Sequence, residues 1–170
     1  GYSAYSKVTR ETLTRLAKMG YSVAHIPMGR ANRMGAYVDR GVLIYPSGED
    51  PWCEDVAVQR YVDFKADMAI FLKEPWVMRS LYKWGINLVP WAIIDHEPVS
   101  PSITSRLHTA FRILCPSRFA QRELRRAGVD VPTWYCPHGV DTSIFKPLPE
   151  RREDCKRMWF LEPDDYTVLI

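Results

Sequence analysis

The stretch "IIDHEP" holds the densest group of chemically active residues in the chain, with Asp95, His96 and Glu97 directly after an apolar run. An imidazole in that place could take a proton from a bound hydroxyl or give one to a phosphate, while a neighbouring carboxylate fixes its tautomer. The acids could instead only stabilise the start of the next helix, because carboxylates are favourable at helix N-termini. The spacing alone leaves acid–base chemistry and helix capping open.

Three further apolar runs also end in polar or aromatic residues. Glu74 and Trp76 follow "ADMAIFLK", Ser117 and Arg118 follow "FRILC", and His138 with Gly139 follows "VPTWYC". A serine and an arginine at a helix start could bind an anion, or the serine could simply cap the helix. Trp76 could stack on a sugar ring or pack into the core. These residues are the candidates for a ligand site beside His96.

The elements that must position these residues alternate between strand and helix. Apolar periodicity, glycine stops and prolines at first helical turns predict both kinds. A glycine-rich stretch without a clear period, 29–41, is expected to be a loop. The predicted helices are 3–19, 51–64, 75–85, 100–110 and 117–128, and the predicted strands are 21–27, 42–46, 66–72, 87–94, 111–115 and 131–136.

This alternation predicts an α/β fold with a doubly wound parallel sheet. Short apolar strands that alternate with helices are typical of parallel sheets covered on each face. In such folds the ligand site lies beyond the carboxyl ends of the strands, where the loops meet. The candidate residues above all follow predicted strands, so we expect them along one edge of the sheet.

Composition narrows the function classes. The chain has 170 residues, of which 46% are hydrophobic and 25% charged, as in an ordinary globular domain. Its net charge of +3 is too small to favour a nucleic-acid partner. No apolar run approaches the roughly 20 residues that span a bilayer. The expected location is the cytoplasm, and no strongly basic amphipathic helix supports peripheral attachment to a membrane.

The four cysteines are far apart and form no metal-ligand spacing, so we expect free thiols. No paired carboxylate motif of the D-x-D type follows a predicted strand, and neither a nicotinamide fingerprint nor a phosphate-binding P-loop motif is present. No metal and no cofactor are therefore expected.

The order of these motifs resembles the N-terminal domain of the group-1 (family 4) retaining glycosyltransferases of GT-B fold. "GYSAYSKVTRETLTRLAKMGYSV" is similar to their first loop and helix, and "ADMAIFLKEPW" to a strand that ends in an acid before Pro-Trp. "ILCPSRFAQRELRRAGV" matches "hxxSxxxxxxLxxxGh". "CPHGVDTSIFKPLP" matches "hPNGVDxxxFxP" and is the most specific of these pieces. The likeness runs nearly from end to end.

The resemblance implies transfer of a sugar from a nucleotide-sugar donor to a hydroxyl acceptor, with retention of anomeric configuration. It assigns His96 as the catalytic residue that points at the transferred sugar. The remaining candidates divide into two groups. The donor or phosphate side holds Gly1, Tyr2, Ser3, Ser117, Arg118, His138 and Gly139, and the acceptor side holds Glu74, Trp76, Asp95 and Glu97.

The resemblance also implies a two-domain enzyme. Residues 1–149 would form the acceptor-side Rossmann-like domain, lacking its first strand, with an interdomain segment at 137–149. Residues 150–170 would be the lead-in helix and first strand of a C-terminal donor domain. The partners would be the nucleotide sugar, an acceptor that is a sugar, a lipid or a small molecule, and that further domain. We expect no sugar transfer by residues 1–170 alone.

A different class remains open beside the enzyme. A free-standing α/β module that binds a carbohydrate or a nucleotide without catalysis would need the same fold and many of the same residues.

Overall fold

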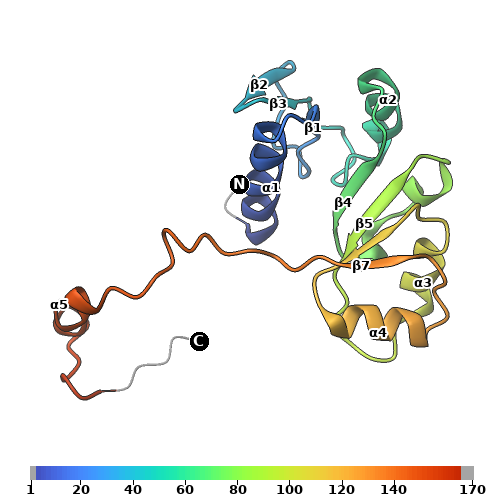
Figure 1. Cartoon of the computed structure of the whole chain (residues 1–170). Helices are drawn as coiled ribbons and strands as arrows, with labels where there is room; N and C mark the ends of the chain where they lie inside the picture. The colour runs from blue at the N-terminus through green and yellow to red at the C-terminus, as the bar shows by residue number, and fades with distance from the viewer. Residues whose placement is uncertain (1–2, 166–170) are drawn as a thin grey trace. The chain divides into compact units, whose positions relative to one another are not determined.

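The computed structural model describes residues 3–165, which divide into two compact units. The first unit extends to His138 and contains two β-sheets with their helices (Figure 1). The second unit begins at Gly139.

A four-stranded, all-parallel sheet lies at the centre of the first unit. Its strands are β4 (Ala69–Lys73), β5 (Leu88–Ala92), β6 (Ile113–Cys115) and β7 (Thr133–Tyr135), in that spatial order. Successive strands lie side by side and helices flank the sheet (Figure 1). The predicted α/β fold with a parallel sheet is confirmed.

β5 is the most buried strand, and all its residues are enclosed. Pro90 stands in its middle and has no N–H to donate, and β5 pairs with β6 at a single position, Trp91 opposite Leu114. Apolar side chains from the neighbouring elements fill the space around the sheet. The largest fully buried ones are Met78, Leu88, Leu107, Ile113 and Leu124.

A second, three-stranded sheet is formed by β1 (Val23–His25), β3 (Val42–Ile44) and β2 (Tyr37–Asp39), in that order. β1 and β3 are parallel, whereas β2 and β3 form an antiparallel hairpin. The prediction that 29–41 is all loop was therefore wrong at its end. The hairpin turn uses Arg40 and Gly41, both with positive φ, and Arg40 hides the signal because most such turns use asparagine or glycine there.

Four α-helices belong to the first unit, namely α1 (Ala4–Lys18), α2 (Glu54–Phe64), α3 (Pro101–Leu107) and α4 (Arg118–Arg126). Serine side chains cap three of them by accepting a backbone N–H two or three residues further on, and Ser117 was predicted to do so. The helix predicted over 51–64 begins three residues later than predicted, at Glu54. The capping serines are Ser3, Ser100 and Ser117.

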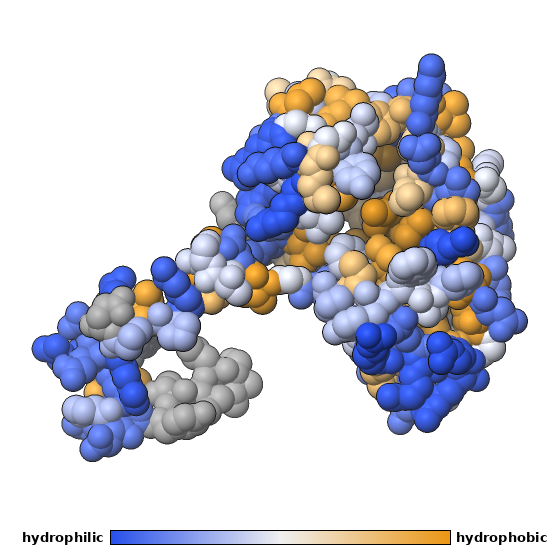
Figure 2. Space-filling view, in the orientation of Figure 1, coloured by the Kyte–Doolittle hydropathy of each residue, from blue (hydrophilic) through white to orange (hydrophobic). Residues whose placement is uncertain are grey.

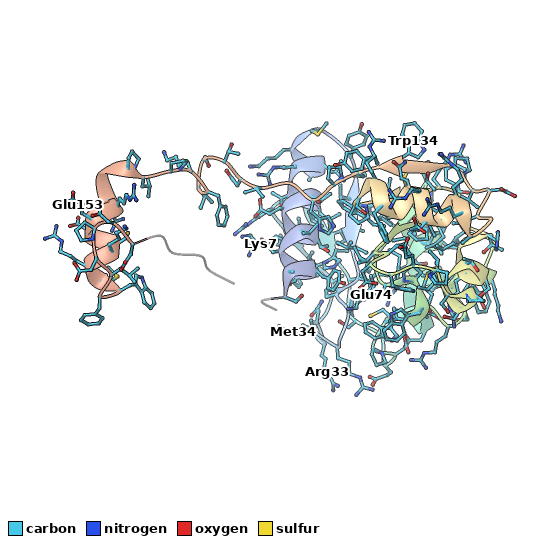
Figure 3. The ribbon with its side chains drawn as sticks, turned by 90° about the horizontal axis from the view of Figure 1, so that it is seen from below. Lys7, Arg33, Met34, Glu74, Trp134 and Glu153 are labelled. Carbon is cyan, nitrogen blue, oxygen red and sulfur yellow. The ribbon has the colours of Figure 1, made fainter. Side chains whose placement is uncertain are left out.

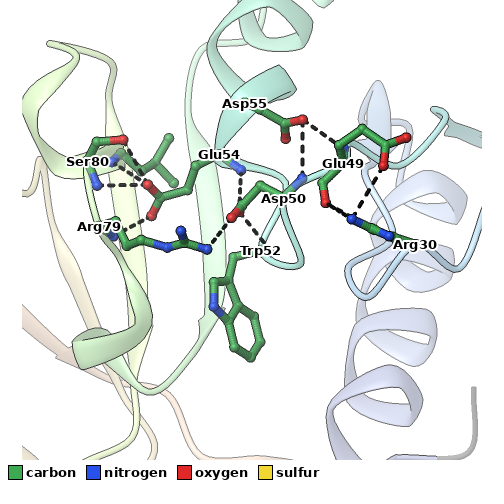
Figure 4. Close-up of polar contacts among 9 residues, drawn as sticks. Arg30, Glu49, Asp50, Trp52, Glu54, Asp55, Arg79 and Ser80 are labelled. Carbon is green, nitrogen blue, oxygen red and sulfur yellow. Dashed lines mark hydrogen bonds and ion pairs between the residues drawn. The ribbon is translucent and has the colours of Figure 1, made fainter.

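The helix predicted over 75–85 was wrong. The chain instead forms two short 3₁₀ turns, η1 (Pro75–Val77) and η2 (Leu81–Lys83). Between them the Glu54 carboxylate accepts the N–H groups of Arg79 and Ser80, each at 2.7 Å (Figure 4). Those N–H groups would be bonded to carbonyls in a helix, so a carboxylate from α2 replaces the helical ladder here.

The second unit contains η3 (Pro149–Arg151) and α5 (Arg152–Met158). The strand expected near the end of 150–170 falls mostly on residues 166–170, outside the described residues, and the interdomain segment at 137–149 stays a prediction. No helix in the described part of the chain is long and apolar enough to cross a membrane. All four cysteines are free, as expected.

Candidate functional site

The candidate site lies along the carboxyl edge of the four-stranded sheet. Because its strands are parallel, the residues that follow them gather along one edge. α1 adds residues from its first turn to this edge. The side chains concerned are Tyr5, Lys73, Glu74, Asp95, His96, Ser117, Arg118 and His138.

Three of these residues, Tyr5, Glu74 and Lys73, are in direct contact. The Tyr5 phenol donates a hydrogen bond to Oε1 of Glu74, and the Lys73 ammonium lies 3.1 Å from Oε2 of the same carboxylate. The Lys73 Nζ also stands 4.2 Å from the centre of the Tyr5 ring, within cation–π range. Figure 3 shows Glu74 near α1, whose first turn carries Tyr5. We call these three residues the Tyr5 cluster.

In the Tyr5 cluster the pKa of Tyr5 is raised and the pKa of Glu74 is lowered. Burial, the hydrogen bond to Glu74 and the nearby charges of Glu74 and Asp95 together raise the pKa of Tyr5 to about 12. Burial pushes the pKa of Glu74 upward, but hydrogen bonds from Tyr5, its own backbone and Lys73 outweigh it and hold that pKa below its usual value. At neutral pH the cluster therefore holds a neutral phenol and a carboxylate beside the Lys73 side chain.

Asp95 and His96 form the second group at this edge. The Nδ1 of His96 lies 2.9 Å from Oδ1 of Asp95, and the hydrogen bond lowers the pKa of that carboxyl. A carboxylate that accepts from Nδ1 leaves Nε2 without its proton in the neutral ring, so Nε2 can act as a base. The Asp95 charge also acts on the Tyr5 phenol, so this pair lies near the Tyr5 cluster.

The acids after β5 do not cap the helix that follows. The N-cap of α3 is Ser100, whose side chain accepts the N–H of Ser102. Glu97 instead faces Arg126 on α4 at 3.8 Å, and the same guanidinium contacts the buried carboxylate of Glu123 at 2.9 Å. The structure therefore brings Asp95 together with His96 and directs Glu97 away from them.

Ser117 and Arg118 have local roles in the structure. The Ser117 side chain accepts the N–H of Ala120 as a helix cap. The Arg118 guanidinium lies 4.2 Å above the ring of Tyr135 and donates to Gln121. Of the two possibilities that the sequence left open, capping is the one seen for Ser117.

His138 packs against the central strand. Its ring meets Trp91 edge-on, with centroids 4.9 Å apart, and the indole N–H of Trp91 donates to the carbonyl of Cys136 at 2.9 Å. The exit of β7 is thus fixed to β5. Gly139 begins the second unit, and a Cβ added there meets nothing within 4 Å.

The remaining candidates are Trp76 in η1 and three residues at the start of the chain. Trp76 is 57% exposed in η1, so its face is available to a ligand and is not packed in the core. Ser3 caps α1, and its hydroxyl accepts the N–H of Ser6. Gly1 and Tyr2 lie outside the described residues.

Sequence reasoning missed the participation of Tyr5. Tyr5 was expected on the apolar face of the first helix, and no pattern pairs it with an acid 69 positions later. The adjacent Lys-Glu pair at the end of β4 was visible and was the one available signal.

No cluster of three metal-ligating side chains occurs within residues 3–165. No protein-family model matches the chain, and no curated protein matches it either.

Proposed function

We propose that this chain is the acceptor-side half of a retaining glycosyltransferase of GT-B architecture. It would transfer a sugar from a nucleotide-sugar donor to a hydroxyl acceptor in the cytoplasm. The observation that carries the proposal is the Asp95–His96 pair after β5, at the carboxyl edge of a parallel sheet, where the hydrogen bond to Nδ1 leaves Nε2 of the neutral ring able to accept a proton. The order of motifs along the chain supports the same assignment.

Sugar transfer from a nucleoside diphosphate needs little covalent chemistry from a protein. It needs a positioned acceptor hydroxyl, stabilisation of the charge on the departing phosphates, and exclusion of water. His96 can bind and orient a hydroxyl through Nε2 while Asp95 fixes the ring. In the Tyr5 cluster the phenol O–H is already donated to Glu74, but the Lys73 ammonium has N–H donors beyond its contact with that carboxylate.

The proposal includes two parts beyond the described sheets. One is a first strand that precedes Gly1. The other is a C-terminal donor domain, for which 150–170 would be the entry and which would grip most of the nucleotide. Without that domain the donor has no complete site, so residues 1–170 alone would show no sugar transfer.

A screen of common nucleotide sugars, run on the protein extended through its donor domain, tests this proposal. We expect donor hydrolysis or transfer with at least one of them, and a loss of about 100-fold or more in His96→Gln. His108→Gln is the matched control, because His108 is an exposed histidine at the end of α3 and should leave the rate unchanged.

Binding of a nucleotide sugar without any turnover would favour the non-catalytic carbohydrate- or nucleotide-binding module. Equal rates for His96→Gln and the parent protein would remove His96 from catalysis. Robust transfer by residues 1–170 alone would overturn the division into two halves.

A further inference from the structure

Two turns of the backbone lie side by side at one end of the three-stranded sheet. In the pairing of its strands the β2–β3 turn, at Arg40 and Gly41, lies at the amino end of β1. α1 leads into that same end of β1, and a Cβ added to Gly41 would stand only 3.4 Å from the Cβ of Ala17 in the last turn of α1. We call residues 19–21 and 38–41 the tip.

The backbone of the tip is held in place by turn geometry. α1 ends in a glycine turn, in which the N–H of Tyr21 donates to the carbonyl of Leu16 at 3.2 Å and Gly20 has a positive φ. Arg40 and Gly41 have positive φ in the hairpin turn. Two adjoining turns form a convex surface, so their side chains project outward.

Large apolar side chains are exposed at the tip. Met19 is 70% exposed, Val38 69% and Tyr21 61%. Figure 2 shows apolar residues on the surface where Figure 1 places the β2–β3 hairpin, next to a hydrophilic surface along α1. Single exposed apolar residues are ordinary on a protein, but three of them on two adjoining turns form a patch of the kind that marks an interaction site.

Basic residues surround this apolar patch. Residues 3–45 contain seven basic and two acidic residues, a net charge of +5, whereas the whole chain has a net charge of +3. Both acids are paired inside this segment, Glu11 with two arginines and Asp39 with Arg40. Figure 3 shows one of the basic residues, Lys7, on the side of α1 that is turned away from the sheets. The exposed basic residues of α1 are Lys7, Arg10, Arg15 and Lys18.

We propose that the tip docks on a lipid bilayer whose surface carries anionic headgroups. Met19, Tyr21 and Val38 enter the interface between the headgroups and the acyl chains, and Lys18 and Arg40 lie at the level of the lipid phosphates. Tyrosine is favourable at that depth, because its ring is apolar while its hydroxyl reaches water. Stable peripheral attachment needs two signals, and the tip supplies an apolar one and a basic one.

A bilayer suits this surface better than a second copy of the chain or a nucleic acid. In a symmetric dimer the net charge of +5 on residues 3–45 would face itself, and the charges beside β2 oppose strand pairing between copies. A single-stranded nucleic acid is held in a basic groove, whereas the tip is convex. The tip combines residues from two segments of the chain, so the sequence showed no single amphipathic helix of this character.

Docking through the tip leaves the candidate site in water. Tyr5 lies in the first turn of α1 and Lys18 in the last, so the two are separated by about 20 Å along the helix. The Tyr5 cluster is therefore at the end of α1 remote from the bilayer. The exposed apolar residues and the surrounding charge carry this assignment, which does not depend on glycosyltransferase activity.

Co-sedimentation of the 170-residue chain with vesicles tests the proposal. Vesicles of phosphatidylcholine alone are compared with vesicles that also contain about 30 mol% phosphatidylglycerol. We expect an apparent affinity at least about tenfold higher for the anionic vesicles, and it should fall as salt is added, because screening weakens the attraction. Met19→Ser combined with Tyr21→Ser should lower the affinity for the anionic vesicles by about tenfold or more, since less apolar area enters the interface.

Val62→Ser combined with Met68→Ser is the matched control for the apolar pair. Both side chains are exposed, but they stand next to the acids Asp63 and Asp67 in the sequence. This control should bind the anionic vesicles as the parent chain does, because exposed apolar area without basic neighbours supplies only one of the two signals.

Arg40→Asn tests the basic part of the tip, and Lys65→Asn is its control. Both positions have positive φ, which asparagine tolerates, so neither substitution strains the backbone. Arg40→Asn should weaken the binding to anionic vesicles by about fivefold, while Lys65→Asn should leave it unchanged.

A measurement on the unsubstituted chain locates the contact and stays valid if a variant misfolds. Bicelles that contain phosphatidylglycerol and a gadolinium-chelating lipid broaden the NMR signals of amides that lie near the lipid. We expect broadening at Met19, Gly20 and Gly41, and none at Trp134 in β7.

Several results would overturn the proposal. Equal binding to the two kinds of vesicle, or binding to neither, would do so, and so would a loss in the Val62 and Met68 control as large as in the tip pair. Broadening centred on α4 would place the contact elsewhere. Tighter binding to a single-stranded oligonucleotide than to anionic vesicles, or a dimer that the tip pair abolishes, would give the tip another occupant. No readout involves a donor sugar, so failure here and failure of the proposed function are distinguishable.

Discussion

Tyr5 and Glu74 are joined by a hydrogen bond that spans 69 positions of the chain. The phenol comes from the helix that packs on the three-stranded sheet, and the carboxylate follows the first strand of the four-stranded sheet. The contact therefore ties the two sheets of the first unit together. The charge of Asp95 also reaches this contact, because it adds to the rise in the pKa of Tyr5 that burial and Glu74 cause.

Removal of the Tyr5 hydroxyl tests this tie. Tyr5→Phe keeps the ring under the Lys73 ammonium but leaves Glu74 without its donor, so we expect the free energy of unfolding to fall by about 1 to 2 kcal/mol. Urea denaturation measures it. Tyr21→Phe, at an exposed tyrosine, is the control and should change stability by less than about 0.5 kcal/mol. Equal losses in the two variants would argue against the tie.

Burial of the Tyr5 phenol, together with the same contact, makes stability depend on alkaline pH. Tyr5 has a pKa of about 12 in the folded chain, against an ordinary value of 10.0. The folded chain thus holds this proton more tightly, so the contribution is complete below pH 10.0 and is lost as pH rises through about 12. Unfolding curves from about pH 8 to about pH 12 should show a steeper fall for the parent chain than for Tyr5→Phe. Parallel curves would contradict the assignment.

Glycine is required at position 48 by a close approach to α2. A Cβ built on Gly48 would stand 2.0 Å from Oδ1 of Asp55, whose carboxylate also accepts the N–H of Glu49 at 2.8 Å. Gly48→Ala must displace that carboxylate, and we expect a loss of about 1 to 3 kcal/mol in thermal or urea unfolding. Gly35→Ala, where a Cβ meets nothing within 4 Å, should be nearly neutral. A neutral Gly48→Ala would show that the turn adjusts freely.

Glu54 holds the segment that replaces the predicted helix over 75–85. One of its carboxylate oxygens accepts from the backbone and the hydroxyl of Ser80, and the other accepts the N–H of Arg79 (Figure 4). Glu54→Gln removes one acceptor and the charge, so we expect a loss of about 1.5 to 3 kcal/mol, measured by urea unfolding. Glu49→Gln is the control, since that side chain is 85% exposed. Similar values for both would contradict this role.

Under the proposed function, Asp95 would act on sugar transfer through His96. In the longer protein that the proposal requires, Asp95→Asn removes the charge that fixes the imidazole, so kcat should fall by about tenfold or more while KM for the donor changes little. Initial rates at varied donor concentration give the two constants. Asp130→Asn, at an exposed aspartate beyond α4, should match the parent. A change in KM alone would make Asp95 a binding residue.

The strands and helices with a clear apolar periodicity were predictable, because neighbouring residues in the sequence determine each of them. The parallel strands follow apolar runs, and Ser117 lies one residue before a helical pattern that ends at Gly128. The position of the candidate site at the carboxyl edge of the sheet was predicted from the places where the strands end. Each of these signals needs only a short window of sequence.

Long-range contacts were not predictable. Residues 75–85 have a helical pattern, yet Glu54, more than 20 positions away, takes the N–H groups that a helix would use. Tyr5 enters the site only because α1 packs beside β4. In the sequence Gly48 looks like any other loop glycine, and only the structure shows that the Asp55 carboxylate lies beside it. In each case a residue distant in the sequence determines the local structure, and a single sequence does not reveal which residue that is.

The two kinds of strand edge in the first unit have different consequences for solubility. The outer strand β2 carries Asp39 and is followed by Arg40, and charges at an edge discourage pairing with other molecules. The open edge of β4 presents Ile70 and Leu72 instead. An open, apolar edge of this kind recruits other chains, so the β4 edge favours self-association that rises with protein concentration, whereas the charged β2 edge opposes it.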